Sequence, residues 1–326
     1  MTKLSYSEAI RQAMTDCMKQ DPDVFLMGED IGVYGGAFGV SRGMLAQFGP
    51  ERIINTPLSE GSFVGMAIGA ALTGARPIVE IMFMDFITLA VDQLVNQAAK
   101  LHYVYGKQAR CPIVIRAVGG AGRNYGPTHS QNLEAWFCHT PGLKVVAPSS
   151  VEDAYNMMKA AIYDDNPVIF LEHKLLYPIK EDCVLNPEIG KLAGPVRLLQ
   201  GGDVTVISYS YMTYEAQVAA HILQKQGISV DLIDLRTLHP LDETIILESV
   251  KNTGRVLIVA EEARSCGVSA EITSRIFEQA YEYIDAPVRR LTLPDVPVSA
   301  SPSLEKAAMP DRSAIVRAVH ELCSKT

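Results

Sequence analysis

Long apolar runs are missing from this chain of 326 residues. No stretch reaches the roughly 18 uncharged apolar residues that suggest a membrane-spanning helix. The amino-terminal segment MTKLSYSEAIRQAM carries Glu8 and Arg11 where a secretory signal requires an unbroken apolar core. We therefore expect a soluble protein with no membrane partner and a cytoplasmic location.

Basic clusters and paired cysteines are also missing. The formal net charge is −8, and no Lys/Arg cluster is longer than the pair Arg289–Arg290, so nucleic-acid binding is not predicted. The six cysteines lie far apart without a C-x-x-C pair, which argues against a zinc site and a disulfide framework. Reduced, structural thiols are the expectation.

Short apolar runs are present and alternate with helical patterns. The runs at 24–27, 77–83, 112–118, 144–148 and 167–172 are apolar on both faces, which is typical of central strands in a parallel sheet. Helices are predicted after Ser59, over 86–100 and over 150–163, where Ser150 is placed to cap and Asp153 to reach back. The first part of the chain therefore predicts an α/β layer domain.

A second α/β domain is predicted after an irregular segment. Residues 183–202 contain scattered Pro and Gly without a helical period, and the alternation of strand and helix patterns resumes at residue 203. A length of 326 residues with 48% apolar content is enough for two domains with separate cores. We expect these domains to cover residues 1–185 and 195–326.

Two glycine-rich segments fail the tests for phosphate binding. GGAGRNYG at 119–126 follows a predicted strand, but its glycines miss the dinucleotide fingerprint by one position and Pro127 interrupts the helix that should follow. GEDIGVYGGAFGVSRG at 28–43 has no G-K-[ST] and is not a P-loop; a surface turn is its plainest interpretation. Neither segment predicts a nucleotide site.

Five segments together carry a resemblance to a known family. They are GEDIGVYGGAFGVSRG, RIINTPLSEGSFVGMAIGAALTGARPIVEI, THSQNLEAWFCHTPGLKVVAPSS, DNPVIFLEH and LIDLRTLHPLD. In this order and spacing the chain resembles the β subunit of the thiamine-diphosphate-dependent first component of 2-oxo acid dehydrogenase complexes, a group that includes pyruvate, acetoin and branched-chain dehydrogenases. The resemblance covers nearly the whole chain. It implies an α/β fold in which a transketolase-like pyrimidine-binding domain precedes a transketolase C-terminal-type domain.

The resemblance gives roles to Glu60 and His129. It implies that Glu60 faces the aminopyrimidine of the cofactor, where a carboxyl group hydrogen-bonded to the ring nitrogen favours the imino tautomer. His129 would line the site entrance and assist acyl transfer to a lipoyl group. Judged without the resemblance, Glu60 is a solvent-facing acid in a first helical turn and His129 an ordinary loop histidine.

Further residues match family positions around the cofactor and around a structural cation. Glu29 would anchor the pyrimidine, and Leu58, Met82 and Phe86 would pack on its ring; core packing is the other interpretation of the three apolar residues. The run 160–167, with a carbonyl near Ile113, matches a potassium site that suits hard oxygen ligands. The residues carried over for this site are Ile113, Ala161, Ile162, Asp164 and Asn166, and a helix end followed by a Pro turn is the alternative.

One expected motif is absent. The chain lacks the G-D-G…N pattern with which thiamine enzymes hold magnesium diphosphate, because Gly202–Asp203 has neither the trailing glycine nor the downstream Asn. The resemblance therefore implies that an α subunit holds the magnesium, in an assembly of two α and two β chains attached to a lipoyl acyltransferase core.

The sequence predicts a catalytic subunit that decarboxylates a 2-oxo acid, pyruvate first. Acetoin and branched-chain dehydrogenase β subunits are the alternatives. A non-catalytic scaffold subunit is disfavoured because Glu60 and His129 are both present. A transketolase-like sugar-phosphate enzyme is disfavoured because the diphosphate motif and basic phosphate-binding residues are missing.

Overall fold

The computed structural model describes residues 2–186 and 188–324. The chain forms two compact units. One contains Met1–Gly119 and Trp136–Ala193, and the other contains Gly120–Ala135 and Gly194–Thr326. Residues 120–135 therefore leave the first half of the chain and belong to the second unit, which matters for His129.

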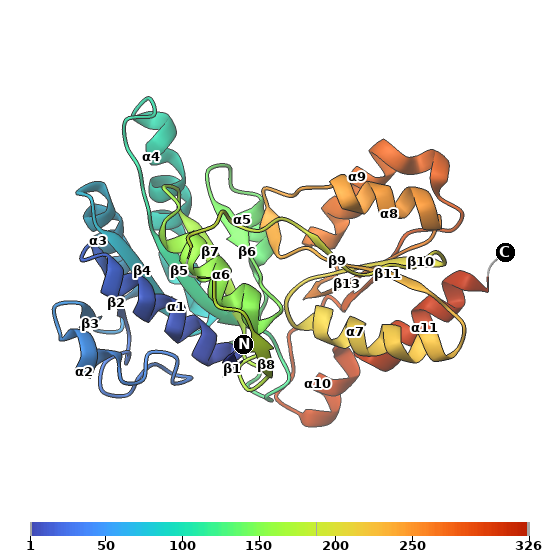
Figure 1. The fold of residues 1–326 in the computed structure, drawn as a ribbon, viewed down its shortest axis with the longest axis horizontal. Helices are drawn as coiled ribbons and strands as arrows, with labels where there is room; N and C mark the ends of the chain where they lie inside the picture. Colours follow the sequence, from blue (N-terminus) through green and yellow to red (C-terminus); the bar gives the residue numbers. More distant parts are fainter. Residues whose placement is uncertain (1, 187, 325–326) are drawn as a thin grey trace. The chain divides into compact units, whose positions relative to one another are not determined.

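The first unit is built on a parallel sheet with the strand order β6-β7-β5-β4-β2-β3 (Figure 1). The strands are β2 (Val24–Gly28), β3 (Ile53–Asn55), β4 (Arg76–Ile81), β5 (Val114–Gly119), β6 (Lys144–Val146) and β7 (Val168–His173). Every residue of β5 and β7 is buried. This confirms the prediction of central parallel strands from runs that are apolar on both faces.

Helices cover this sheet, and a terminal ribbon completes the unit. The helices are α1 (Tyr6–Gln20), α2 (Met44–Phe48), α3 (Glu60–Leu72), α4 (Ala99–Val104) and α6 (Val151–Ile162). Helix α5 (Glu134–Cys138) contains the point at which the chain returns from the second unit to the first. Helices α1 and α6 pack against each other, and β1 (Thr2–Ser5) pairs antiparallel with β8 (Lys180–Cys183). Ser150 caps α6 by accepting a hydrogen bond from the Asp153 backbone N–H at 3.1 Å, as predicted, while the Asp153 carboxylate accepts from the Ser150 hydroxyl.

The single α-helix predicted over 86–100 is wrong. This stretch runs as a 3₁₀ segment, η1 (Met84–Ala90), then a π-helical segment, η2 (Gln93–Ala98), and only then as α4. The backbone here lies close to α3, since a Cβ on Gly61 would be 3.0 Å from the Leu89 carbonyl oxygen. The spacing of apolar residues indicates that a stretch is helical, but it does not distinguish a 3₁₀ turn or a π turn from an α turn.

The second unit has a five-stranded sheet with the order β14-β13-β10-β11-β9, in which only β9 is antiparallel to its neighbour. Its strands are β9 (Val196–Leu199), β10 (Val204–Ser208), β11 (Val230–Asp234), β13 (Val256–Ala263) and β14 (Arg289–Leu293), and a short strand β12 covers Thr237–His239. Its helical elements are α7 (Ser210–Lys225), α8 (Thr244–Thr253), α9 (Val268–Ala280), η3 (Tyr281–Tyr283), α10 (Pro302–Ala308) and α11 (Arg312–Cys323). Helices α7 and α11 share a core on one face of the sheet, and α8 and α9 cover the other (Figure 1).

No helix in the described part of the chain has the length and apolar character needed to cross a membrane. All six cysteines are free thiols, and Cys17, Cys111 and Cys183 are buried. Burial raises the pKa of Cys17 and of Cys111 to about 12, so these two thiols stay protonated and act as small core residues.

Candidate functional site

Two acidic side chains lie together at the carboxyl ends of neighbouring strands. Glu29 directly follows β2, and Glu60 begins α3, which comes after β3; β2 and β3 are hydrogen-bonded neighbours. Only 4% of Glu29 and 7% of Glu60 are exposed. The carboxyl edge of a parallel sheet is where open α/β folds bind ligands. The surface-acid interpretation of Glu60 is therefore wrong.

Glu29 has a raised pKa. Burial and, to a lesser extent, the negative charge of Glu60 raise it to about 7, and a backbone hydrogen bond from Ser59 opposes both. The Glu29 Oε1 atom is buried without a hydrogen-bond partner among the described residues. The Glu29 carboxyl group can therefore hold a proton near neutrality, and its Oε1 atom is left for a ligand.

A buried ionic network supports the strand ends beneath Glu29. The Arg116 guanidinium on β5 contacts the carboxylates of Glu80 on β4, at 2.5 Å, and of Glu172 on β7, at 2.6 and 2.9 Å. Tyr177 donates its hydroxyl to Glu172 at 2.7 Å. Burial raises the pKa of Glu80, while the two carboxylates hold the pKa of Arg116 above its usual range.

Two glycines of the 28–43 segment close over this network. A Cβ on Gly28 would be 2.6 Å from the Glu80 carbonyl oxygen, and one on Gly36 would be 2.4 Å from Glu80 Oε1. Gly36 also has φ +81°, where side chains are strained. The segment is thus more than the surface turn that its composition suggested, because it packs on the network and carries Glu29.

The three apolar residues predicted around the cofactor differ in burial. Leu58 is 79% exposed, which excludes core packing for this residue. Met82 and Phe86 are half-buried and follow β4, the other neighbour of β2. Phe86 meets Phe83 edge to face with ring centroids 6.0 Å apart. All three come from chain segments that follow the carboxyl ends of β3 and β4, as Glu60 does.

His129 lies in the excursion that belongs to the second unit. It is half-buried, its Nδ1 is 3.0 Å from the Thr128 hydroxyl, and its backbone N–H donates to the Gly126 carbonyl at 3.4 Å. The GGAGRNYG run that precedes it donates backbone N–H groups to carboxylates of its own unit, to Glu261 from Ala121 and to Glu305 from Gly122. The anionic groups that this glycine-rich loop binds are therefore carboxylates of the same chain.

The predicted potassium ligands gather where α6 leads into β7. The carbonyl oxygens of Ile162 and Asp164 lie 3.1 and 3.5 Å from one nitrogen of Arg76. The Ile113 carbonyl accepts from the Val168 N–H at 2.9 Å, and Asn166 donates to the Asp164 carboxylate. Each carbonyl oxygen has a second lone pair, so this set retains hard acceptors for a cation next to the Arg76 charge.

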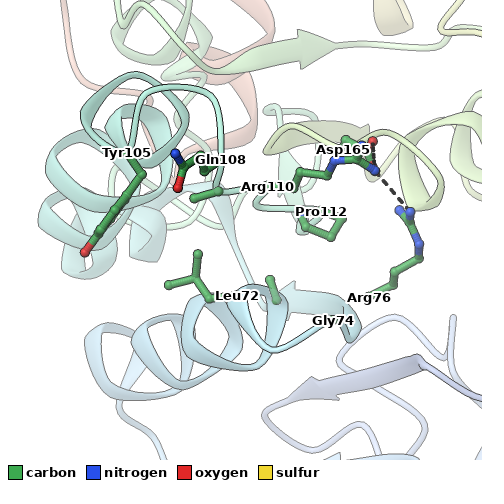
Figure 2. Close-up of a pocket in the computed structure, with 10 residues that line it drawn as sticks. Leu72, Gly74, Arg76, Tyr105, Gln108, Arg110, Pro112 and Asp165 are labelled. Atoms are coloured by element: carbon green, nitrogen blue, oxygen red, sulfur yellow. Dashed lines mark hydrogen bonds and ion pairs between the residues drawn. The ribbon is translucent and has the colours of Figure 1, made fainter.

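A pocket of about 530 Å³ lies beside this segment (Figure 2). Arg76 and Arg110 share Asp165 on its wall, at 3.1 and 3.0 Å. Leu72 and Gly74 bring the carboxyl end of α3 into the pocket, about 18 Å along that helix from Glu60. This pocket is therefore separate from the acidic pair.

Comparison with known proteins identifies the fold of both units. The model of the transketolase pyrimidine binding domain matches residues 2–180, and that of the transketolase C-terminal domain matches residues 195–315. A split-gene transketolase, solved as an inactive β4 tetramer, superposes with a TM-score of 0.77 at 22% identity and 98% coverage of both chains. A transketolase from Pichia stipitis gives 0.73 at 14% identity, covering 99% of this chain and 46% of that one. These two structures show the fold alone.

Curated relatives give the family. The chain is 45% identical to the pyruvate dehydrogenase E1 component subunit beta of Rickettsia felis, over 98% of both chains. It is 43% identical to a mitochondrial counterpart from rice, over 98% of this chain and 86% of that one, and 42% identical to the yeast counterpart, over 98% and 89%. The chain belongs to the pyruvate dehydrogenase E1 β subunit family. The predicted fold class and the predicted family are confirmed.

Sequence reasoning missed several residues that shape the site. Arg116, Glu80 and Glu172 each sit in a predicted strand, where a charge that interrupts an apolar run is a signal for a buried ion pair. Glu261 and Glu305 gave no comparable signal, because a carboxylate that caps a distant loop has no local pattern.

Proposed function

We propose that this chain is the β subunit of a pyruvate dehydrogenase that decarboxylates its 2-oxo acid on thiamine diphosphate and passes the acyl group to a lipoyl domain. The observation that carries the proposal is the buried pair Glu29 and Glu60 at the carboxyl edge of β2 and β3. The names of the curated relatives support pyruvate over acetoin or a branched-chain substrate.

The pair fits the aminopyrimidine of the cofactor. When bound, thiamine diphosphate supplies a nucleophilic carbon that takes up the 2-oxo acid and allows carbon dioxide to leave. Glu60 holds a proton at the pyrimidine ring nitrogen, and Glu29 offers its unpartnered Oε1 as a second polar anchor. Leu58, with its exposed side chain, and the half-buried Met82 and Phe86 cover the ring and exclude water.

Other components complete the enzyme in this proposal. An α subunit holds magnesium and the diphosphate, because the G-D-G…N pattern is absent from the present chain. Two α and two β chains assemble in a symmetric tetramer, which a lipoyl acyltransferase core binds. We propose a cytoplasmic location for the complex, and cell fractionation tests it.

Potassium is proposed as a structural ion. The carbonyl groups of Ile113, Ala161, Ile162 and Asp164, together with Asn166, would hold it. Carbonyl and carboxylate oxygens are the hard ligands that such a cation prefers, and the carbonyl oxygens of Ile162 and Asp164 lie close enough together to contact the same nitrogen of Arg76.

Replacement of Glu60 tests the proposed function. Glu60→Gln keeps the side-chain volume but cannot hold the shared proton, so turnover of pyruvate by the reconstituted α and β chains should fall about 100-fold or more. Glu51→Gln, an exposed acid in the same unit, is the matched control and should keep full activity. Near wild-type turnover of the Glu60 variant would remove the basis of the assignment. Assays with acetoin and branched-chain 2-oxo acids in parallel test the substrate.

The role of His129 needs two assays. His129→Ala should impair acyl transfer to a lipoyl domain while decarboxylation with an artificial electron acceptor changes little, because only the transfer step needs a proton donor or acceptor at the site entrance. An equal loss in both assays contradicts this role.

A further inference from the structure

The loop Gly120–Asn132, here the His129 loop, has an unusual backbone. Gly120, Gly122 and Gly126 have φ of +88°, +88° and +79°, and Asn124, which is not a glycine, has φ +57°. Left-handed residues that alternate with ordinary ones turn successive backbone N–H groups toward one side and form an anion-binding concavity. Such a backbone is stable only if the N–H groups are satisfied.

Glu305 fills this concavity from α10. It is 3% exposed, and its carboxylate accepts from the Gly122 N–H at 2.9 Å and from the Asn124 N–H at 3.0 and 3.2 Å, one distance to each oxygen. Hydrogen bonds to an ionised acceptor are about twice as strong as neutral ones. Nearby, a Cβ on Gly126 would be 3.3 Å from the Ala300 Cβ, so the loop is also seated against the segment that leads into α10.

Glu261 joins the two ends of the loop. Its Oε1 accepts from the Ala121 N–H at 2.5 Å, and its backbone carbonyl accepts from the Asn132 side-chain amide. Glu261 is buried in β13, a strand flanked on both sides in the sheet. Both ends of the loop are therefore attached to one buried strand residue, and His129 lies three residues before the second attachment.

We propose that Glu305 and Glu261 are positioning residues that fix the His129 loop and thereby set the place of the His129 imidazole during acyl transfer. The proposal rests on the role of His129 proposed above. Neither carboxylate touches the reacting atoms in this scheme. Both act through the backbone of residues 121–124 and through Asn132.

Glu305→Gln is the main test, in the reconstituted assembly of α and β chains. The amide of Gln is neutral, so both backbone donors lose their bonds to an ionised acceptor. Its N–H₂ group replaces Oε2, which leaves the Asn124 N–H only the longer contact of 3.2 Å with Oε1. Hydrogen exchange of the peptide covering 120–132 should become about tenfold faster, because the loop opens locally without global unfolding. Acyl transfer should fall about tenfold, while decarboxylation with an artificial acceptor stays within about twofold.

Two variants serve as controls. Glu215→Gln removes a similarly buried carboxylate of the second unit, which accepts from the Arg312 backbone N–H at 3.0 Å and from the side chains of Arg312 and Tyr211. It should leave exchange of the 120–132 peptide unchanged. Glu261→Gln keeps the single acceptor that Ala121 needs, so its effect should be smaller than that of Glu305→Gln.

The double variant separates positioning from general damage. With His129 already replaced by Ala, adding Glu305→Gln should reduce acyl transfer by less than about twofold further, because both changes act on one group. Unchanged exchange of the loop in Glu305→Gln overturns the anchoring, whatever His129 does. If His129→Ala is selectively impaired in acyl transfer, but Glu305→Gln loosens the loop without lowering acyl transfer, the proposed positioning of His129 is wrong. Equal loss of both activities in His129→Ala overturns the proposed role of His129 and, with it, the positioning role of Glu305 and Glu261. Hydrogen exchange then still tests separately whether the two carboxylates anchor the loop.

Discussion

Arg116→Met should cost this protein a large part of its stability. The guanidinium is 1% exposed and makes three contacts of 2.5–2.9 Å with two buried carboxylates, Glu80 and Glu172. Removing one partner from a buried ion pair costs about 3–5 kcal/mol, and here two carboxylates lose the same cation, so we expect the upper end, about 5 kcal/mol. Met keeps most of the apolar volume, so little of the loss comes from a cavity. The total stability of a domain is only about 5–15 kcal/mol.

The pH dependence of this loss gives the sharper test. Burial raises the pKa of Glu80, and the charge of Arg116 opposes this rise. Without Arg116 the folded pKa of Glu80 lies further above the unfolded one, so the stability deficit of the variant should shrink as pH falls from about 8 to about 5. Urea denaturation of variant and wild type across this range measures the deficit.

An exposed arginine provides the matched control. Arg110→Met removes a side chain that is 71% exposed and contacts Asp165 at 3.0 Å, and it should cost no more than about 1 kcal/mol at any of these pH values. If Arg116→Met is too unstable to purify, combining it with Glu80→Gln and Glu172→Gln should restore folding, because no buried charge is left unpaired. A deficit below about 1 kcal/mol, or one that does not shrink toward low pH, would refute the argument.

The remaining predictions concern the acidic pair, the partner chain and the cation. The pKa of Glu29 is raised to about 7, so the stability that its protonated form contributes is present at low pH and is lost as pH rises through 7. As pH rises from about 5 to about 8, the thermal midpoint of Glu29→Gln, measured without cofactor, should therefore increase relative to that of wild type. A constant difference between the two midpoints would contradict the raised pKa. The isolated β chain should bind thiamine diphosphate and magnesium at least about tenfold more weakly than the assembly with its α subunit in calorimetric titrations, and turnover by the β chain alone would refute the shared site. Potassium chloride should raise the unfolding temperature above that in choline chloride at equal ionic strength if the 161–166 segment binds the ion; equal midpoints would count against this site.

Local sequence patterns were sufficient to predict most of the fold. Strands β2, β4, β5, β6 and β7 were predicted from runs that are apolar on both faces, because a strand buried on both sides by helices cannot tolerate regular polar alternation. The Ser150 cap of α6 was predicted because capping depends on residues three apart. The stretch 84–104 shows the limit, since a change from 3₁₀ to π to α hydrogen bonding depends on contacts with α3 that no local pattern records.

The sequence by itself determined which chemical groups this protein has: an acid at the start of a helix, a histidine in a loop, and no diphosphate motif. Only the tertiary structure decided their environment. Glu29 acquires a pKa of about 7 because the fold buries it and because Glu60, 31 positions away, is brought beside it. Arg116 reaches two buried carboxylates because β5 lies between β4 and β7: Glu80 is its register partner on β4, and Glu172 on β7 lies two positions beyond its partner Phe170. Glu305 reaches residues 122–124 from more than 180 positions away. Burial and electrostatic interactions depend on distances in space. The sequence predicts such distances only for residues a few positions apart in the chain.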